Sequence, residues 1–536
     1  MSIHFHHRLP RTSHFEFRPE LDELIKWWVL GGRGVAVLRG IGGAGKTALA
    51  ERFVSLAQEW GRRAAGEGPD PDPTGSEPAM PRSFPPLPDT FVYSFYAEPS
   101  TSAFLKALGD WLGLEPSAGG RHTVEAVRDR LASADERGDR RGRVLLVLDG
   151  LERVQAPARE PNDPRAGRIE DPELRGLLQD IAGGWTPYAA AIITTRLPTT
   201  VDLDLDDEPG QSREIRIENL SEASAAKLLR NVGVQANDEQ IRQLLKWYGL
   251  HALTVRLLGS QIAAYDGGDP GRVLAAQRIN TSAPADDDAE ALIQLDDQTP
   301  RRREAVVQAR RLERIVAWYR ERLSAAELAV MKALAVLGDV VEEGVLLGAV
   351  GAVWPSEPGS AEPPEASELR HALASLRRIG LVEAGSEQTD ADPTAEGRVT
   401  HTAHPSVREG FRRLLDVPSA RRVSAEAASA MRADSSRAPR FLRPYDFDEF
   451  PVLPAESVRY AERLIMHLIA AGELDEAFDV FRNVLGGAGL AQSREGADAN
   501  AAARICDALL GAALAPAGIE PGSALAASIN SSSVCQ

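Results

Sequence analysis

The chain has 536 residues and a formal net charge of −17. At about 100 to 200 residues per domain, this length predicts three or four domains, and the acidic balance argues against a protein that mainly coats nucleic acid or an anionic membrane. Its two cysteines, Cys506 and Cys535, form no metal-ligand spacing, and no stretch approaches the roughly 18 apolar residues of a membrane span, so we expect a cytoplasmic protein without membrane contact.

The N-terminal segment is rich in histidine, with His4, His6, His7 and His14. Such a composition can bind a metal, but no acid or cysteine lies among these residues, so we expect no site there. The following apolar residues recur at helical spacing and predict a helix through Leu21, Leu24, Ile25 and Trp28.

The stretch from Gly40 to Thr47 matches glycine, four free positions, then glycine, lysine and a hydroxyl residue. An apolar run typical of a buried strand precedes it, and apolar residues at helical spacing follow. In this context backbone N–H groups bind phosphate oxygens, lysine neutralises the terminal phosphates and the hydroxyl binds Mg²⁺. We predict a nucleotide site with Mg²⁺, rather than a glycine-rich turn that binds nothing, formed by Gly40, Gly42, Gly43, Ala44, Gly45, Lys46, Thr47 and Ala48.

Residues 61–89 are rich in Gly, Pro, Asp and Glu, which predicts a disordered insertion. A strand is expected at residues 90–96, and apolar residues from Phe104 to Leu112 predict a helix after it.

A second apolar run, residues 143–148, ends in Asp149. A buried parallel strand would deliver this carboxylate to the edge of the sheet where ligands bind, so Asp149 and Thr47 are expected to face one Mg²⁺. Glu152 either orients or deprotonates the attacking water, or is a solvated acid at a helix start.

A third apolar strand, residues 190–195, leads into Arg196. A guanidinium there can bind the third phosphate through two parallel hydrogen bonds and so distinguish a triphosphate from a diphosphate. The alternative is a surface arginine after a strand.

These three motifs together resemble those of the signal-transduction ATPases called STAND proteins, most closely the NB-ARC branch. The resemblance extends over most of residues 15–415. It implies adenine nucleotide (ATP or ADP) as cofactor, roles for Lys46, Thr47, Asp149 and Arg196 in binding phosphates and Mg²⁺, and a sensor strand between the other two motif strands. It also implies that Arg18 contacts the base, although Phe17 stands where the family has glycine.

Apolar positions after residue 218 predict a helical lid at 219–280. His251 stands in Gly249-Leu250-His251-Ala252-Leu253, where the family has a proline that packs against the nucleotide, and histidine can also stack there. The nucleotide-binding domain would then span 1–218, and acidic and proline-containing sequence predicts a linker at 281–304.

Helices followed by a hairpin predict a winged-helix domain at 305–418, including a capping box at Ser324–Glu327. Between residues 301 and 420 there are 16 lysines and arginines against 18 acidic residues, which disfavours DNA binding. The resemblance implies that His404 reaches the diphosphate; the alternative is an ordinary histidine in a turn.

Residues 419–510 predict a helical, TPR-like region with one helix pair resembling a single repeat of what looks like a truncated array, and 511–536 a flexible tail. The predicted fold class is α/β: a P-loop NTPase parallel sheet, then an all-α lid, a winged-helix domain and the helical region.

The predicted function is an ADP/ATP-binding signal-transduction switch that self-associates when ATP replaces ADP, with an unknown protein partner and slow hydrolysis aided by Lys46, Glu152 and Arg196. One alternative is a nucleotide-gated transcription regulator whose winged helix binds DNA. Another is a metabolic phosphotransferase, which would need a small-substrate pocket that the sequence does not reveal.

Overall fold

The computed structural model describes residues 3–9, 14–64, 84–85, 87–115, 122–133, 144–156, 163, 165–205, 210–279, 300–338, 340–354, 364–387, 398–444, 455–487 and 496–514. Contacts group the chain into two compact units. The first comprises Met1–Arg322, Arg377–Gly385 and His404–Val407, and the second comprises Leu323–Leu376, Ser386–Ala403 and Arg408–Gln536.

The first unit is built on a six-stranded parallel sheet in the order β1-β3-β4-β5-β2-β6. Its strands are β1 (Ile3–Phe5), β2 (Gly34–Arg39), β3 (Asp89–Ser94), β4 (Val144–Asp149), β5 (Ala189–Thr195) and β6 (Arg213–Arg216). The sensor strand β5 lies between the phosphate-loop strand β2 and the Asp149 strand β4, which confirms the expected order.

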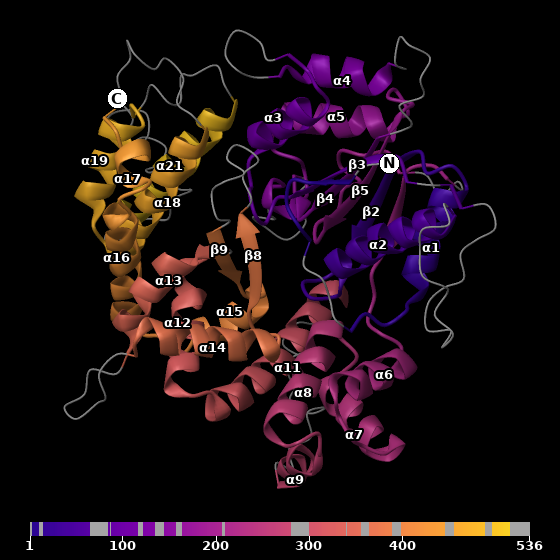
Figure 1. Ribbon diagram of the computed structural model, residues 1–536, viewed down its shortest axis with the longest axis vertical. Coiled ribbons are helices and arrows are strands. Elements are labelled where there is room, and N and C mark those ends of the chain that lie inside the picture. The colour runs from indigo at the N-terminus through magenta and orange to yellow at the C-terminus, as the bar shows by residue number, and fades with distance from the viewer. Residues whose placement is uncertain are drawn as a thin grey trace. The chain divides into compact units, whose positions relative to one another are not determined.

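Helices cover both faces of this sheet (Figure 1). On one face are α1 (Pro19–Val29) and α2 (Lys46–Ala64), and on the other are α3 (Thr101–Trp111), α4 (Val124–Ala132) and α5 (Pro172–Ala182). Alternate residues of each central strand point to opposite faces, so Val37 packs on the side of α3, α4 and α5 and Leu38 on the side of α1 and α2. With both faces buried, the central strands read as continuous apolar runs.

Helices follow the sheet in the same unit: α6 (Glu222–Val232), α7 (Asp238–Tyr248), α8 (Ala252–Tyr265), α9 (Gly271–Ile279) and α11 (Pro300–Arg322). Ser221 and Asn237 cap α6 and α7 through their side chains, and Asn237 forms a capping box with Gln240. The hydroxyl of Tyr319 on α11 donates to the carbonyl of Leu257 on α8 at 2.9 Å, which ties α11 to the predicted lid.

The second unit contains helices and part of a three-stranded sheet in the order β7-β9-β8. Its elements are α12 (Ala325–Leu337), β7 (Val341–Glu342), α13 (Glu343–Val350), β9 (Arg398–Thr402), α16 (Val417–Ala433), α17 (Ala438–Phe441), α18 (Ala455–Ala471), α19 (Leu474–Val484) and α21 (Gly496–Leu514). Three elements are divided between the two units: α14 (Ala366–Arg378), β8 (Glu383–Glu387) and α15 (Pro405–Arg412). The predicted capping box is present: Ser324 accepts from the Glu327 N–H, and Glu327 accepts from the Ser324 N–H.

Several predicted boundaries differ from the observed ones. α2 extends to Ala64, so the insertion predicted from residue 61 begins inside a helix. Arg62 and Arg63 form the last turn of this helix, after the buried Trp60. Residues 65–83 and 86 of the predicted insertion, 281–299 of the linker and 515–536 of the tail lie outside the described residues. Residues 300–304 of the predicted linker instead begin α11, and residues 511–514 of the predicted flexible tail end α21. The last strand of the large sheet is Arg213–Arg216.

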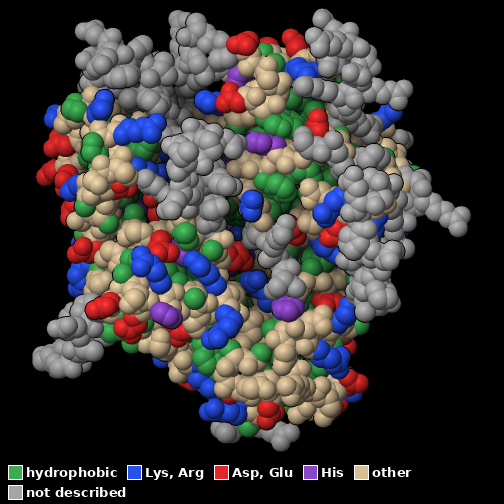
Figure 2. Space-filling model, in the orientation of Figure 1, with side chains coloured by type: hydrophobic (Ala, Val, Ile, Leu, Met, Phe, Trp, Pro, Cys, Tyr) green, Lys and Arg blue, Asp and Glu red, His purple; other side chains and the backbone are tan. Residues whose placement is uncertain are grey.

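No helix in the described ranges is long and apolar enough to cross a membrane. On the face drawn in Figure 2, lysine and arginine side chains are interspersed with aspartate and glutamate.

Candidate nucleotide-binding site

The phosphate loop joins β2 to α2 and can adopt its bend only with glycines. Gly43 and Gly45 have φ angles of 80° and 99°, a region that other residues rarely adopt. A Cβ atom on Gly40 would lie 2.7 Å from the carbonyl oxygen of Ile217, so this glycine allows the close approach of the segment after β6. Ala44 is buried, and Ala48 lies in the first turn of α2. The loop therefore leads directly into the N-terminus of α2, an arrangement that can bind phosphate.

Lys46 folds back over the loop that precedes it. Its Nζ donates to the carbonyl oxygens of Gly40 and Ile41 at 2.9 and 3.0 Å, and the residue is only 6% exposed. Burial lowers the pKa of Lys46 to about 8, while the nearby carboxylate of Glu152 opposes that fall. The ammonium is therefore still charged at neutral pH and is held against the phosphate loop.

Asp149 ends β4 and gathers three hydroxyl groups. Thr47 Oγ1 and Thr194 Oγ1 donate to its Oδ1 at 2.6 and 2.7 Å, and Ser94 Oγ donates to its Oδ2 at 3.3 Å. Burial raises the pKa of Asp149, and the hydrogen bonds from Thr47 and Thr194 oppose the rise. The structure thus brings Thr47 and Asp149 together as the sequence predicted. A carboxylate beside a hydroxyl is a donor set that suits Mg²⁺.

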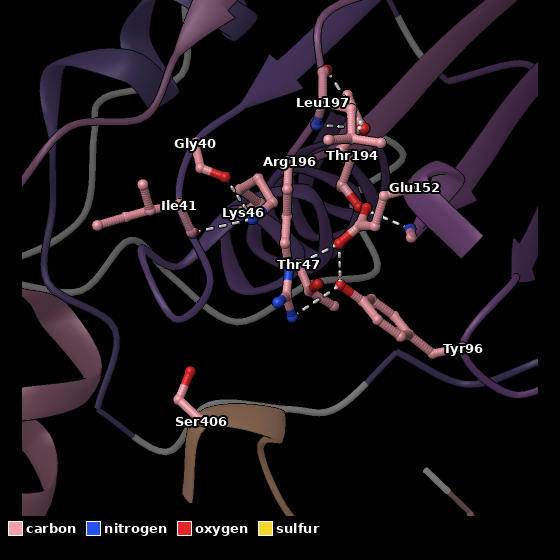
Figure 3. Close-up of polar contacts among 12 residues, drawn as sticks. Gly40, Ile41, Lys46, Thr47, Tyr96, Glu152, Thr194, Arg196, Leu197 and Ser406 are labelled. Atoms are coloured by element: carbon pink, nitrogen blue, oxygen red, sulfur yellow. Dashed lines mark hydrogen bonds and ion pairs between the residues drawn. The ribbon is translucent and has the colours of Figure 1, made fainter. Parts of the chain in front are cut away.

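Glu152 lies in the short helix Leu151–Arg153 after β4 and contacts two side chains (Figure 3). Its Oε1 lies 2.8 Å from Arg196 Nε and accepts a hydrogen bond from the Tyr96 hydroxyl. Arg196 NH2 also donates to the Tyr96 hydroxyl at 3.3 Å. A Cβ on Gly42 would lie 3.0 Å from Arg196 NH1, so the guanidinium extends from β5 to the phosphate loop. The predicted acid and the predicted phosphate sensor are therefore partners.

The predicted lid contacts the phosphate loop directly. The N–H of Leu253 donates to the carbonyl oxygen of Gly43 at 3.2 Å, and a Cβ on Gly43 would lie 2.8 Å from His251 Cε1. His251 precedes α8, and its Nδ1 lies 3.2 Å from Thr254 Oγ1. Burial lowers the pKa of His251 to about 4, although a hydrogen bond with the backbone of Gly42 opposes this. The ring is therefore neutral and packs on the loop.

Arg18 supports the same loop from the N-terminal side. Its NH1 donates to the Ala44 carbonyl at 2.6 Å, and its NH2 donates to the Glu218 carbonyl at 2.5 Å. Glu20 holds the guanidinium through both carboxylate oxygens, at 2.9 and 3.1 Å. These contacts join the start of α1, the phosphate loop and the segment after β6. Arg18 thus positions the loop, and its predicted contact with the base stays a prediction.

His404 belongs to the first unit, although it lies far from the phosphate loop in sequence. Its Nδ1 accepts a hydrogen bond from the Ser406 N–H at 3.2 Å. Burial and the positive charges of Arg196 and Lys46, among other groups, hold the pKa of His404 well below 6.5. A neutral imidazole that accepts at Nδ1 carries its proton at Nε2, so His404 has one N–H to donate.

The histidines near the N-terminus meet an acid that the sequence did not reveal. His6 and His7 Nε2 lie 3.9 and 3.8 Å from Glu98 Oε2. This geometry could hold a metal ion. However, His7 Nδ1 accepts the N–H of Ser94 at 3.3 Å, so a neutral His7 carries its proton on the nitrogen that faces Glu98 and offers no lone pair there. This cluster is better explained as a contact between β1 and the turn after β3.

Sequence reasoning missed three residues of the site: Ser94, Tyr96 and Thr194. Ser94 pairs with Asp149 in the sheet register, and Thr194 also accepts the Gly150 N–H at 2.8 Å. Each lies at or just beyond the carboxyl end of a predicted parallel strand, which was the available signal. Hydroxyl groups at that edge are candidates for the same reason as Asp149.

No family model and no curated protein matches the chain. Among solved structures, the chain is similar to a signal transduction ATPase with numerous domains (STAND) that carries a tetratricopeptide repeat sensor, from Pyrococcus horikoshii. That match has a TM-score of 0.47 and 14% identity and covers 94% of this chain and 54% of that one, so the chain spans about half its length.

Two further structures are similar at lower scores. The ORC1 protein of Aeropyrum pernix, solved in complex with DNA, has a TM-score of 0.30 and 15% identity over 74% of this chain and 94% of that one. A Walker-type ATPase of Pyrococcus abyssi has a TM-score of 0.31 and 14% identity over 76% and 98%. Likenesses this distant carry no argument about function. The chain's own loop, sheet order and Asp149 strand give its first unit the α/β fold of P-loop ATPases.

Proposed function

We propose that this protein is a switch of the STAND class, of the NB-ARC type, that binds ADP in a closed state and self-associates when ATP replaces it. The main support for the proposal is the direct contact between the predicted lid and the phosphate loop. Leu253 and His251 of the lid contact Gly43, and the charges of Arg196 and Lys46 add to the burial that lowers the pKa of His404. Residues from three distant parts of the chain would then contact one nucleotide.

Each of these residues has a distinct part in the proposed cycle. The loop amides and Lys46 would bind the phosphates, and Thr47 and Asp149 would hold Mg²⁺, which would supply charge screening and polarisation at the phosphates. Arg196 senses the third phosphate, and His404 donates from Nε2 to the diphosphate. Glu152 orients the water, because its Oε2 is buried and accepts no hydrogen bond within the described ranges.

The energetic logic is that a ligand shifts an equilibrium only by binding one state better than the other. ADP would favour the state in which His404 and the lid contact the phosphates. ATP would favour a state in which Arg196 binds the third phosphate. Slow hydrolysis would then return the protein to the ADP state, as expected for a switch rather than for a turnover enzyme.

The test is nucleotide binding by the Lys46→Ala variant. We expect the wild type to bind ADP and ATP, and Lys46→Ala to lose both, because the site loses the charge it places beside the phosphates. Isothermal titration with each nucleotide measures this, and Lys106→Ala is the matched control, since Lys106 is an exposed lysine paired with Asp110. Equal affinities in Lys46→Ala and the wild type would refute the proposal.

A further inference from the structure

The guanidinium of Arg196 already binds a carboxylate in this structure. Its Nε lies 2.8 Å from Glu152 Oε1, and its NH2 donates to the Tyr96 hydroxyl at 3.3 Å. The edge of the guanidinium that carries Nε and NH2 is therefore shared by Glu152 and Tyr96 (Figure 3). Arg196 thus contacts Glu152 through Nε while its NH1 lies beside Gly42 of the phosphate loop, where a third phosphate would be a second anionic partner.

Glu152 has little contact with solvent, so it depends on its partners. Its side chain is 10% exposed, and Tyr96 donates to the same Oε1 that Arg196 contacts. Removing one partner of a half-buried ion pair leaves a charge that little water can solvate, which is unfavourable. If Arg196 leaves for a phosphate, the hydroxyl of Tyr96 is the group that still supports the carboxylate.

Tyr96 is held in this position by the backbone. Gly150 has a φ of 77°, and a Cβ there would lie 2.6 Å from Cδ2 of the Tyr96 ring, so the ring packs where only glycine leaves room. Burial, reinforced by the charge of Glu152, raises the pKa of the Tyr96 phenol above its usual range. The hydroxyl therefore remains protonated and donates to Glu152 throughout the physiological range.

We propose that Glu152 competes with the third phosphate for Arg196, and that the Tyr96 hydroxyl lowers the cost of this exchange by staying with Glu152. The inference rests on the proposed nucleotide switch and adds a specificity mechanism to it. A diphosphate leaves the Arg196–Glu152 pair intact, whereas a triphosphate that takes two parallel hydrogen bonds from Arg196 draws the guanidinium toward the loop and weakens the pair. The pair therefore biases the site toward diphosphate, and Tyr96 moderates that bias.

The two neighbours of Arg196 should have opposite effects when they are changed. Glu152→Gln removes the competing charge, so affinity for a non-hydrolysable ATP analogue should rise about tenfold while ADP affinity stays the same. Tyr96→Phe removes the hydroxyl that would still donate to Glu152 when Arg196 binds the phosphate. Affinity for the analogue should therefore fall severalfold, again without a change in ADP affinity.

Double variants separate competition from simple charge repulsion. In an Arg196→Gln background, Glu152→Gln should no longer raise affinity for the analogue, because there is no guanidinium to compete for. In a Glu152→Gln background, Tyr96→Phe should have no further effect. Tyr93→Phe is the matched control: its buried hydroxyl donates to the carbonyls of Glu98 and Ser100, so both affinities should stay unchanged.

Isothermal titration of ADP and the analogue into each full-length variant gives the result. If Glu152→Gln raises affinity for the analogue equally with and without Arg196, the effect is repulsion and the competition is refuted. If the wild type binds both nucleotides and Glu152→Gln and Tyr96→Phe change nothing, the inference fails while the switch stands. A wild type that binds neither nucleotide would overturn both.

Discussion

Lys46 is expected to destabilise the nucleotide-free protein, because the site requires a buried charge. Burial lowers its pKa from 10.5 to about 8, and this fall corresponds to about 3 kcal/mol against the charged form. Lys46→Met keeps most of the apolar stem and removes the charge. The carbonyls of Gly40 and Ile41, which now accept from Nζ, are half-buried, so water can replace the lysine there. The free energy of unfolding of Lys46→Met should therefore exceed that of the wild type by about 1–3 kcal/mol.

The contribution of Lys46 to stability changes with pH in a definite direction. Between pH 8 and 10.5 the unfolded chain binds a proton at Lys46 that the folded chain has released, so this residue makes stability rise with pH in that window. Below pH 8 both states are protonated, and the destabilisation is constant. In Lys46→Met this contribution to the pH dependence should be absent.

Thermal unfolding of nucleotide-free protein, with and without ADP, is the assay. Lys46→Met should melt a few degrees above the wild type without ADP. Added ADP should stabilise the wild type by about 2.7 kcal/mol at a hundred times its Kd and the variant by nothing. Lys106→Met, at an exposed lysine, should change neither value. A Lys46→Met protein that melts below the wild type, or that retains the ADP effect, would refute this reasoning.

Three further changes test other parts of the site. Asp149→Ala should retain most of the ADP affinity but lose Mg²⁺-dependent hydrolysis, measured as phosphate release; normal hydrolysis would place the metal elsewhere. Thr194→Val removes the hydroxyl that donates to Asp149, so it should lower stability by about 3 kcal/mol in urea unfolding and weaken Mg²⁺ binding. The hydroxyl of the neighbouring Thr195 donates to Gln155 instead, so Thr195→Val should lower stability only. His404→Ala should release ADP about ten- to a hundredfold faster in stopped flow, from the loss of about 1.5–3 kcal/mol; equal off-rates would make His404 an ordinary turn residue.

The sequence predicted those parts of the site whose signals are local. The loop before Lys46, the strand that ends in Asp149 and the strand before Arg196 each combine an apolar run with a polar end, and the structure places all three at one sheet edge. A parallel sheet must deliver such residues to its carboxyl edge, so pattern and chemistry sufficed.

Contacts between distant residues could not be predicted in this way. Tyr96 and Glu152 are 56 positions apart, and no period or motif links a tyrosine after one strand to an acid after the next. The short strand β1 was not predicted because it has only three residues, and the N-terminal segment was considered only for its histidines. The same strand brings His6 and His7 to Glu98, an acid that composition near the histidines could not reveal. The predicted domain boundaries and the winged-helix assignment stay predictions.

The central claim is that this site holds ADP in a closed switch, and the most direct test is to identify what the purified protein carries. Denaturing the protein and separating the released small molecules by chromatography should yield about one ADP per chain from the wild type and none from Lys46→Ala. A wild-type protein that releases no nucleotide, and that binds neither ADP nor ATP when they are added, would contradict the account.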